Sequence, residues 1–280
     1  MALVSSAEIM AAAARSKRVV VAFNVFNNES IDAVIKAAED AQVPVIIGVN
    51  EPDLYHFGID EIAAIVRIKA ERARTDVILH LDHGMSVGVI ARCIKAGFTS
   101  VMMDPFKVLD QEKIAVVRQV VEFAHAVRVS VESMVGSLRL ALEGEGEGDS
   151  VEERTDPLKA GTFSRSTGID SLAVSVGTEH GSFLAGKKTE IDMRQLMEIA
   201  RNVDIPLVIH GGSAVRDEQL KELRNHKVGK MNIGSAIRAA YKRAFADALQ
   251  DDQLDVREAA VRARLAMYDV AANKIAMLTL

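Results

Sequence analysis

Short, uniformly apolar runs alternate along the chain with longer stretches in which apolar residues recur every three to four positions. The short runs are rich in valine and isoleucine, which favours strands buried on both faces, and the longer stretches have the period of a helix. We expect strands at residues 19–25, 43–49, 76–82, 100–104, 128–132, 171–176, 206–209 and 228–233. We expect helices at residues 30–41, 62–73, 87–96, 108–126, 193–202, 217–224 and 235–249.

This alternation predicts an α/β fold in which eight parallel strands close into a (β/α)8 barrel, also called a TIM barrel. A doubly wound open sheet is the alternative. We expect residues 1–280 to form this single domain. Ser6 is expected to cap an additional first helix, and an extra C-terminal helical segment over residues 255–280 is expected to pack on the barrel or on a second subunit.

Polar residues collect where the predicted strands end. In a (β/α)8 barrel the carboxyl ends of the strands carry the active site, so residues at these positions are candidates for catalysis or binding. Eight polar side chains fall there: Asn24, Asp82, His83, Asp104, Glu132, His180, His210 and Asn232.

Histidine stands beside glycine at three of these strand ends, within residues 80–84, 176–181 and 209–213. A single histidine in this position is more often a hydrogen-bonded structural residue. Three imidazoles at one end of a barrel can instead hold one divalent metal ion, and three protein ligands leave a position open for a substrate. The shared context therefore indicates a catalytic metal site.

One segment interrupts the rhythm of strands and helices. Residues 134–155 include the acidic, glycine-rich run 143–149, which favours neither helix nor strand and is long for a barrel loop. We interpret this segment as a mobile lid, and a surface insertion is the alternative.

Composition narrows the classes of partner. No apolar run approaches the roughly 20 residues that cross a bilayer, so we expect a soluble protein with no membrane partner. The net charge of −5 disfavours a nucleic-acid partner, since that binding depends on clustered lysine and arginine. Cys93 is the only cysteine, which excludes an internal disulfide and fits the reducing cytoplasm.

Four ordered motifs, at residues 80–84, 173–181, 210–213 and 230–235, resemble those of the class II, metal-dependent aldolases. The resemblance covers nearly the whole chain and is strongest to the branch that cleaves fructose or tagatose bisphosphate and related ketose phosphates. It implies a zinc-dependent aldolase that reversibly cleaves a phosphorylated ketose to dihydroxyacetone phosphate and an aldehyde. It also implies a homodimer or homotetramer.

The resemblance assigns roles to the strand-end residues. It makes His83, His180 and His210 the ligands of one zinc ion, for which another divalent metal could substitute, and makes Asp82 the acid/base. Such an ion would stabilise the enediolate left when the carbon–carbon bond breaks, and Asp82 could remove the C4 hydroxyl proton. The alternative for Asp82 is a partner that orients a histidine. In the lid, Glu143 is the candidate for proton transfer at carbon, with Glu145 and Glu147 as alternatives, and the auxiliary metal ligands would be Asp104 and Glu132.

The same resemblance predicts the phosphate site. Glycines allow backbone N–H groups to approach an anion, and a helix that begins at Ser235 would present its N-terminus to it. Ordinary tight turns are the alternative. The first-strand asparagine Asn24 would face the substrate, and a turn residue is the alternative for it. The residues expected to hold the phosphate are Gly181, Gly211, Gly212, Ser213, Asn232, Ile233, Gly234 and Ser235.

Two departures from the family pattern concern the substrate. Pro105 and Phe106 follow Asp104, where the family has a glycine–serine pair, and Met134 occupies the second of two acidic positions after the fifth strand. These changes suggest a phosphorylated ketose or keto sugar acid other than fructose bisphosphate. A metal-dependent hydrolase and a sugar-phosphate-binding barrel without catalysis are the competing functions.

Overall fold

The computed structural model describes residues 3–136, 154–179, 183, 186 and 188–279. Its parallel strands follow one another in sequence order around a closed barrel, which β1 and β8 complete by pairing with each other. This topology confirms the predicted (β/α)8 barrel over the doubly wound open sheet. The strands are β1 (Val20–Asn24), β2 (Val45–Asn50), β3 (Val77–Gly84), β4 (Ser100–Met103), β5 (Ser130–Val135), β6 (Ser171–Val174), β7 (Leu207–Ile209) and β8 (Val228–Ile233).

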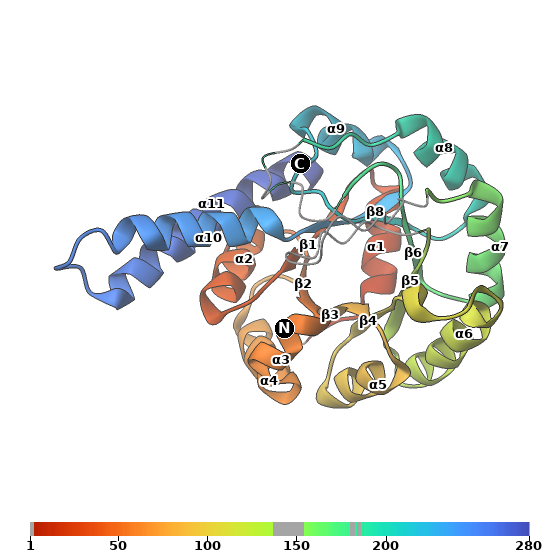
Figure 1. Ribbon diagram of the computed structural model, residues 1–280, viewed down its shortest axis with the longest axis horizontal. Coiled ribbons are helices and arrows are strands. Elements are labelled where there is room, and N and C mark those ends of the chain that lie inside the picture. Colours follow the sequence, from red (N-terminus) through yellow and green to blue (C-terminus); the bar gives the residue numbers. More distant parts are fainter. Residues whose placement is uncertain (1–2, 137–153, 180–182, 184–185, 187, 280) are drawn as a thin grey trace.

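Helices surround the barrel as a ring (Figure 1). Each helix expected from the apolar period is present, and its ends differ from the prediction by three residues or fewer. These helices are α2 (Asn28–Ala41), α4 (Ile59–Arg72), α5 (Val87–Ala96), α6 (Asp110–Ala126), α8 (Met193–Asn202), α9 (Asp217–Glu222) and α10 (Ser235–Ala248). Short 3₁₀ turns precede α6 and follow α9, at η1 (Pro105–Lys107) and η2 (Leu223–Asn225).

Two helices were not predicted, α3 (Glu51–Phe57) and α7 (Pro157–Thr167). The seven residues of α3 are too few to show a helical period. In α7 the start signal is nevertheless present in the sequence, because the Asp156 side chain accepts hydrogen bonds from the backbone N–H groups of Leu158 and Lys159 and Pro157 occupies the first turn.

Helix α1 (Ser6–Arg15) closes the amino-terminal end of the barrel, where it contacts β1, β5 and β8. The expectation that Ser6 caps this helix is wrong, because the N-cap residue is Ser5. The Ser6 hydroxyl instead lies 3.0 Å from Ser100 Oγ and 2.7 Å from Ser130 Oγ, inside the barrel. Met10 of α1 packs with apolar residues that β1, β2 and β3 direct inward.

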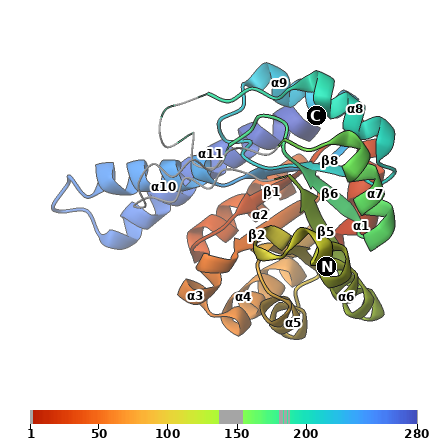
Figure 2. The same cartoon turned by 45° about the vertical axis from the view of Figure 1, so that its right-hand side comes forward.

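The C-terminal segment forms the long helix α11 (Val256–Thr279). It packs against α2 and β1, and the backbone N–H of Val19 donates to the carbonyl oxygen of Leu278 at 2.9 Å. The part of the expectation that placed this segment on the barrel is therefore confirmed. The start of α11 and the end of α10 extend together as an arm beyond the barrel (Figures 1 and 2).

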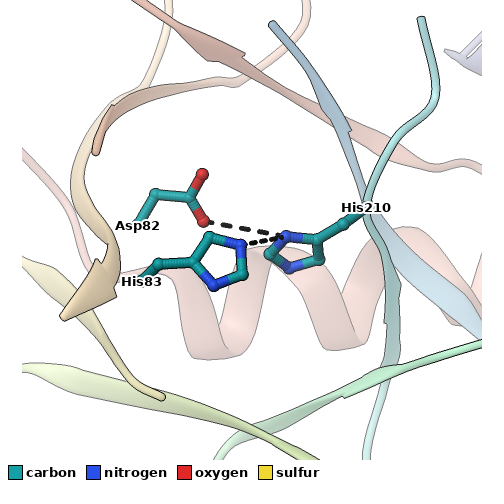
Figure 3. A group of neighbouring side chains, drawn as sticks. All are labelled: Asp82, His83 and His210. Atoms are coloured by element: carbon teal, nitrogen blue, oxygen red, sulfur yellow. Dashed lines mark hydrogen bonds and ion pairs between the residues drawn. The ribbon is translucent and has the colours of Figure 1, made fainter. Parts of the chain in front are cut away.

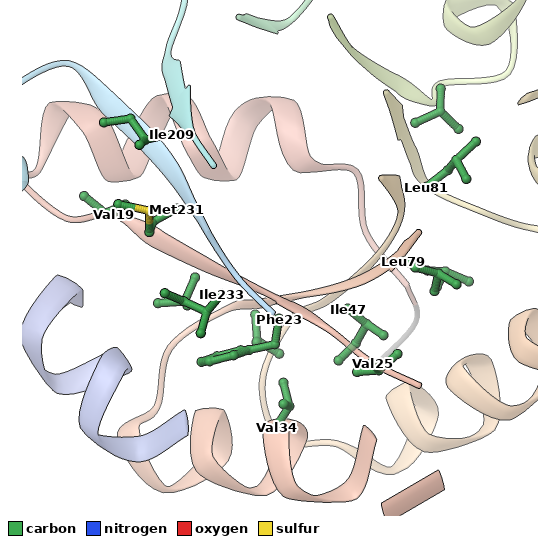
Figure 4. Close-up of a cluster of buried hydrophobic side chains, with 14 of the residues drawn as sticks. Val19, Phe23, Val25, Val34, Ile47, Leu79, Leu81, Ile209, Met231 and Ile233 are labelled. Carbon is green, nitrogen blue, oxygen red and sulfur yellow. The ribbon is translucent and has the colours of Figure 1, made fainter. Parts of the chain in front are cut away.

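Strand alternation decides which side chains reach the inside of the barrel. Phe23, Ile47 and Leu79 point outward and pack with surrounding helices, including Val34 of α2 (Figure 4). The alternate positions of the strands point inward, and the residues there include the buried polar side chains of His80, Asp82, Glu132 and Lys230. In the part of the chain that is described, no helix is both long and apolar enough to span a membrane.

Both ends of residues 134–155, the segment expected to be a lid, belong to the packed fold. Met134 lies in β5, and at the other end Thr155 is 1% exposed and its hydroxyl donates to the carbonyl oxygen of Val135. The remainder of the predicted lid, residues 137–153, lies outside the described residues.

Candidate active site

Asp82, His83 and His210 meet at the carboxyl end of the barrel (Figure 3). Asp82 and His83 belong to β3, and His210 directly follows β7. One potential ligand atom from each of the three lies within 4.8 Å of the others. Two of the three histidines predicted to bind a metal, together with the predicted acid/base, are thus brought together.

A β-bulge turns His83 into this cluster. Adjacent residues of a regular strand point to opposite faces, so His83 would otherwise lie outside the barrel when Asp82 lies inside. His83 instead has a φ angle of 53°, and the register between β3 and β4 shifts between Leu81 and Gly84. The left-handed conformation is strained for a residue with a side chain, so the surrounding contacts must maintain it.

Each of the two imidazoles is hydrogen-bonded to a carboxylate through one ring nitrogen. His83 Nδ1 lies 2.7 Å from Asp104 Oδ2, and His210 Nε2 lies 3.1 Å from Glu132 Oε1. A carboxylate accepts, so both of these nitrogens carry the proton and donate. The remaining nitrogens, His83 Nε2 and His210 Nδ1, carry lone pairs when both rings are neutral, and they lie 3.0 Å apart. His210 Nδ1 also lies 3.3 Å from the amide nitrogen of Asn232.

This pair of nitrogens fits a metal ion. Two lone pairs at hydrogen-bond distance repel each other unless a proton or a cation lies between them. Two nitrogen ligands of a tetrahedral zinc ion, with Zn–N bonds of about 2.0–2.1 Å, are separated by roughly 3.3 Å, close to the observed separation. Imidazole is also a preferred zinc ligand, and the Asp82 carboxylate adds negative charge beside it.

The pKa values of the two histidines reflect the same charges. Burial alone would lower the pKa of either imidazole, but Asp82 and Asp104 outweigh burial at His83, and its pKa is raised. At His210 burial prevails over the nearby Glu132, and its pKa is lowered. Positive charge is therefore favoured on the His83 side of the pair.

Two asparagines hold the Asp82 carboxylate. Asn24 Nδ2 donates to Asp82 Oδ2 at 2.7 Å and to Asn50 Oδ1 at 3.0 Å, while Asn232 Nδ2 donates to Asp82 Oδ1 at 3.1 Å. Burial would raise the pKa of Asp82, but His83, His210 and Lys230 lower it, so this residue is ionised. Asn24, expected to face the substrate, thus orients Asp82, and Asn50 at the end of β2 was missed.

The two predicted auxiliary metal ligands lie outside the cluster of three. Asp104 is bonded to the far side of the His83 ring, and Glu132 lies in the third position of β5 rather than in the loop that follows. The Glu132 carboxylate contacts His210 Nε2 and forms a buried ion pair with Lys230. Both acids orient a histidine in this structure. Lys230 was not predicted, although a lysine at an inward position of an apolar strand is a signal that could have indicated it.

The two predicted phosphate segments lie side by side at the start of α10. The backbone N–H of Gly212 donates to the Asn232 carbonyl oxygen at 3.0 Å, and the Ser213 hydroxyl accepts from the N–H of Ala236 at 3.2 Å. Gly211 has a φ angle of 74°, which favours glycine. The Ile233 side chain is buried outside the barrel, so this residue could contribute only backbone atoms.

Among the described residues, Asn232 Oδ1 is buried without a hydrogen-bond partner. A buried amide oxygen is costly to leave unpaired, so a donor from outside the protein is expected to meet it.

Three predicted site residues lie outside the described residues: His180, Gly181 and Glu143. The two departures from the family pattern are in place, with Phe106 60% exposed beside Asp104. Met134 is buried inside the barrel with Met102, Ala173 and Val208, so an apolar group replaces a carboxylate there.

Comparison with known families and structures gives the following matches. The sequence model of the family described as fructose-bisphosphate aldolase class-II matches residues 4–280. Among solved structures, the YdjI aldolase from Escherichia coli K12 is 27% identical in sequence, with a TM-score of 0.85, and the match covers 99% of this chain and 97% of that one.

Two further structures share the fold at lower identity. A putative fructose-1,6-biphosphate aldolase from Coccidioides immitis has a TM-score of 0.87 at 22% identity, covering 97% of this chain and 94% of that one. The fructose-bisphosphate aldolase Fba from Campylobacter jejuni has a TM-score of 0.82 at 21% identity, covering 99% and 96%.

Proposed function

The chain belongs to the class-II fructose-bisphosphate aldolase family, and on this premise we propose that it reversibly cleaves a phosphorylated ketose to dihydroxyacetone phosphate and an aldehyde. The observation that carries the proposal is the pair of histidine nitrogens, His83 Nε2 and His210 Nδ1, 3.0 Å apart beside the ionised Asp82. His83 and His210 would hold a zinc ion, with His180 as the third ligand on the strength of its sequence motif. When bound, the ion supplies Lewis-acid stabilisation of the negative charge that develops during cleavage.

Asp82 is the residue that would move the hydroxyl proton. Its carboxylate is ionised, and Asn24 and Asn232 each donate to one of its oxygens, so its orientation is fixed before a substrate arrives. During cleavage it accepts the proton of the hydroxyl next to the breaking bond, and during condensation it returns that proton.

Asn232 also offers a contact to the substrate. Its amide nitrogen is used by Asp82, whereas its oxygen is buried and unpaired among the described residues. A hydroxyl of the ketose can donate to this oxygen. One side chain would then hold both the acid/base and the substrate, and so fix the distance between them.

The phosphate of the substrate is expected at the start of α10. The adjacent segments 211–213 and 232–235 place glycine backbone close to the N-terminus of that helix, which favours an anion. The last two strands of a (β/α)8 barrel commonly form such a site.

The aldehyde half of the substrate is expected to differ from that of fructose bisphosphate. Phe106 adds an exposed aromatic side chain beside Asp104, and Met134 replaces an acid with an apolar group. Asp82, His83, His210 and the phosphate segments are retained. We therefore expect the substrate to differ and the cleavage reaction to be the same.

We also propose that the chain self-associates through the arm formed by α10 and α11. Apolar side chains on or beside this arm are exposed: Leu249, Val256, Val261 and Leu265. Light scattering coupled to size-exclusion chromatography would give the mass, and a monomer at micromolar concentration would contradict this part of the proposal.

The proposed activity is tested by incubating the purified protein with a panel of phosphorylated ketoses and measuring dihydroxyacetone phosphate. Release is expected with at least one of them, and a chelator is expected to abolish it until Zn²⁺ is restored. Turnover that resists the chelator would contradict the metal mechanism. Hydrolysis of esters, amides or phosphates by a preparation inactive on every ketose phosphate would favour a hydrolase instead.

A further inference from the structure

A chain of buried polar groups leads from His210 down the inside of the barrel. His210 Nε2 lies 3.1 Å from Glu132 Oε1, and Glu132 Oε2 lies 2.7 Å from Lys230 Nζ. Lys230 Nζ lies 3.1 Å from His80 Nε2, and His80 Nδ1 lies 2.8 Å from Ser100 Oγ. The chain continues to the Ser6 hydroxyl of α1, 3.0 Å from that of Ser100.

The hydrogen-bond directions along this chain follow from the charge of Lys230. An ammonium group only donates, so His80 Nε2 must accept and His80 Nδ1 carries the proton. Burial and the neighbouring Lys230 lower the pKa of His80 to about 3, so this imidazole is neutral. Lys230 therefore has one charged partner, Glu132, and one neutral partner, His80.

Stability alone does not account for this ion pair. Side chains of Lys230 and Glu132 are 1% and 2% exposed, and moving two charges out of water costs free energy that their attraction seldom exceeds by much. Apolar residues of similar volume often serve as well or better in such a position. The neighbouring interior residues Met102, Met134, Ala173 and Val208 show that this barrel does pack apolar groups inside.

We propose that Lys230 is a positioning residue for the metal centre and acts on His210 through Glu132. This inference rests on the proposed function, in which His210 is a metal ligand. Lys230 holds one oxygen of the Glu132 carboxylate, and the other oxygen then faces His210 Nε2. That bond fixes both the orientation of the ring and the nitrogen that carries its proton, and leaves Nδ1 aimed at His83.

Without Lys230 the carboxylate would keep only weak restraint. Among the described residues, Oε2 also accepts a hydrogen bond from the Ser171 hydroxyl, which at 3.4 Å is long. Glu132 could then turn away from His210, and the imidazole could rotate or change its proton position. Metal affinity should fall although no metal ligand has been altered.

The test measures Zn²⁺ affinity by competition with a chromophoric chelator, together with the visible spectrum of the Co²⁺-loaded protein. Lys230→Met keeps the length of the side chain and removes its charge. We expect this variant to bind Zn²⁺ about 10- to 100-fold more weakly, the usual effect of losing a group that orients a metal-binding histidine, and to show altered Co²⁺ bands. Unchanged affinity and an unchanged spectrum would overturn the inference.

Ser6→Ala is the matched control. It removes a buried hydroxyl from the other end of the same chain, so it should lower thermal stability while leaving Zn²⁺ affinity and the Co²⁺ spectrum as in the wild type. If Ser6→Ala changes both as much as Lys230→Met does, the effect is general loosening of the barrel and the inference is wrong.

A double-mutant cycle with Glu132→Gln tests whether Lys230 acts through Glu132. In the Glu132→Gln background, adding Lys230→Met should change Zn²⁺ affinity by less than about twofold, because the carboxylate on which Lys230 acts is gone. A further tenfold loss would overturn the inference. The double variant buries no charge at this position, so the comparison remains available if Lys230→Met alone does not fold.

Failure of this inference differs from failure of the proposed function. Wild-type protein that binds Zn²⁺ through His210, with Lys230→Met binding equally well, contradicts only the role of Lys230. Wild-type protein that binds no Zn²⁺ contradicts both.

Discussion

His83 and His210 point one ring nitrogen at each other across the barrel end, with 3.0 Å between His83 Nε2 and His210 Nδ1, although the residues are 127 positions apart in the chain. The other nitrogen of each ring is hydrogen-bonded to a carboxylate, which is Asp104 for His83 and Glu132 for His210. Two rings held in this way are prepared to bind a cation without rearrangement, and this relationship leads to the first prediction.

His210→Ala is expected to remove most of the bound zinc and, with it, the aldolase activity. Under the proposed function one of three protein ligands is lost, and the two that remain, His83 and His180, bind a zinc ion much more weakly. Elemental analysis of the purified variant measures the zinc content. His56→Ala, at an exposed position on α3, is the control and should retain zinc. A full complement of zinc in His210→Ala would exclude this residue as a ligand.

Asp82→Asn is expected to keep zinc and lower turnover by roughly 100-fold or more, the usual effect of losing a general acid/base. An amide fills the same space but cannot accept the hydroxyl proton as a carboxylate does. Steady-state kinetics on the best ketose phosphate, with zinc content measured in the same sample, separates catalysis from metal binding. Near-normal turnover would mean that Asp82 only orients its neighbours.

Gly211→Ala is expected to destabilise the fold and weaken binding of phosphate. Its φ angle is 74°, and an added Cβ would lie 2.8 Å from the backbone oxygen of Glu179, which cannot easily move. The left-handed conformation alone costs about 1–2 kcal/mol for alanine. Thermal unfolding and inhibition by inorganic phosphate measure the two effects.

Gly88→Ala is the matched control for that substitution. Gly88 lies in α5, and a Cβ there meets no atom within 4 Å. Alanine should therefore leave stability unchanged or raise it by about 0.5–1 kcal/mol through its helix propensity. Equal unfolding temperatures for Gly211→Ala and Gly88→Ala would contradict the strain assigned to Gly211.

Cys93 is expected to resist thiol reagents in the folded protein. Burial raises the pKa of this thiol to about 12, so little reactive thiolate forms at pH 8.5. Because the pKa is raised in the folded state, the unfolded chain loses its proton first as the pH increases, and stability should fall between about pH 9 and 12. Labelling with a chromogenic disulfide reagent before and after denaturation gives the result. Rapid labelling of the native protein would contradict it.

Much of the fold could be predicted because its signals are local. The short apolar runs predict both ends of each of the eight strands to within three residues. Asp82, His210 and Asn232 could be assigned to strand ends because each follows an apolar run. Helix α3 escaped prediction since seven residues carry too little periodic signal. Met134 was placed in a loop, but β5 continues through it, and nothing in the local pattern shows how far a strand pairs with its neighbours.

The sequence by itself determined the alternation of strands and helices, the end of the barrel that carries the chemistry, and the residue types available there. These depend on interactions among residues a few positions apart, which a pattern records. Only the tertiary structure decided that His83 turns inward at a bulge, that Asn24 holds Asp82, and that Lys230 meets Glu132 inside the barrel. Those contacts join different strands, so they depend on the closure and stagger of the whole barrel, which no local pattern encodes.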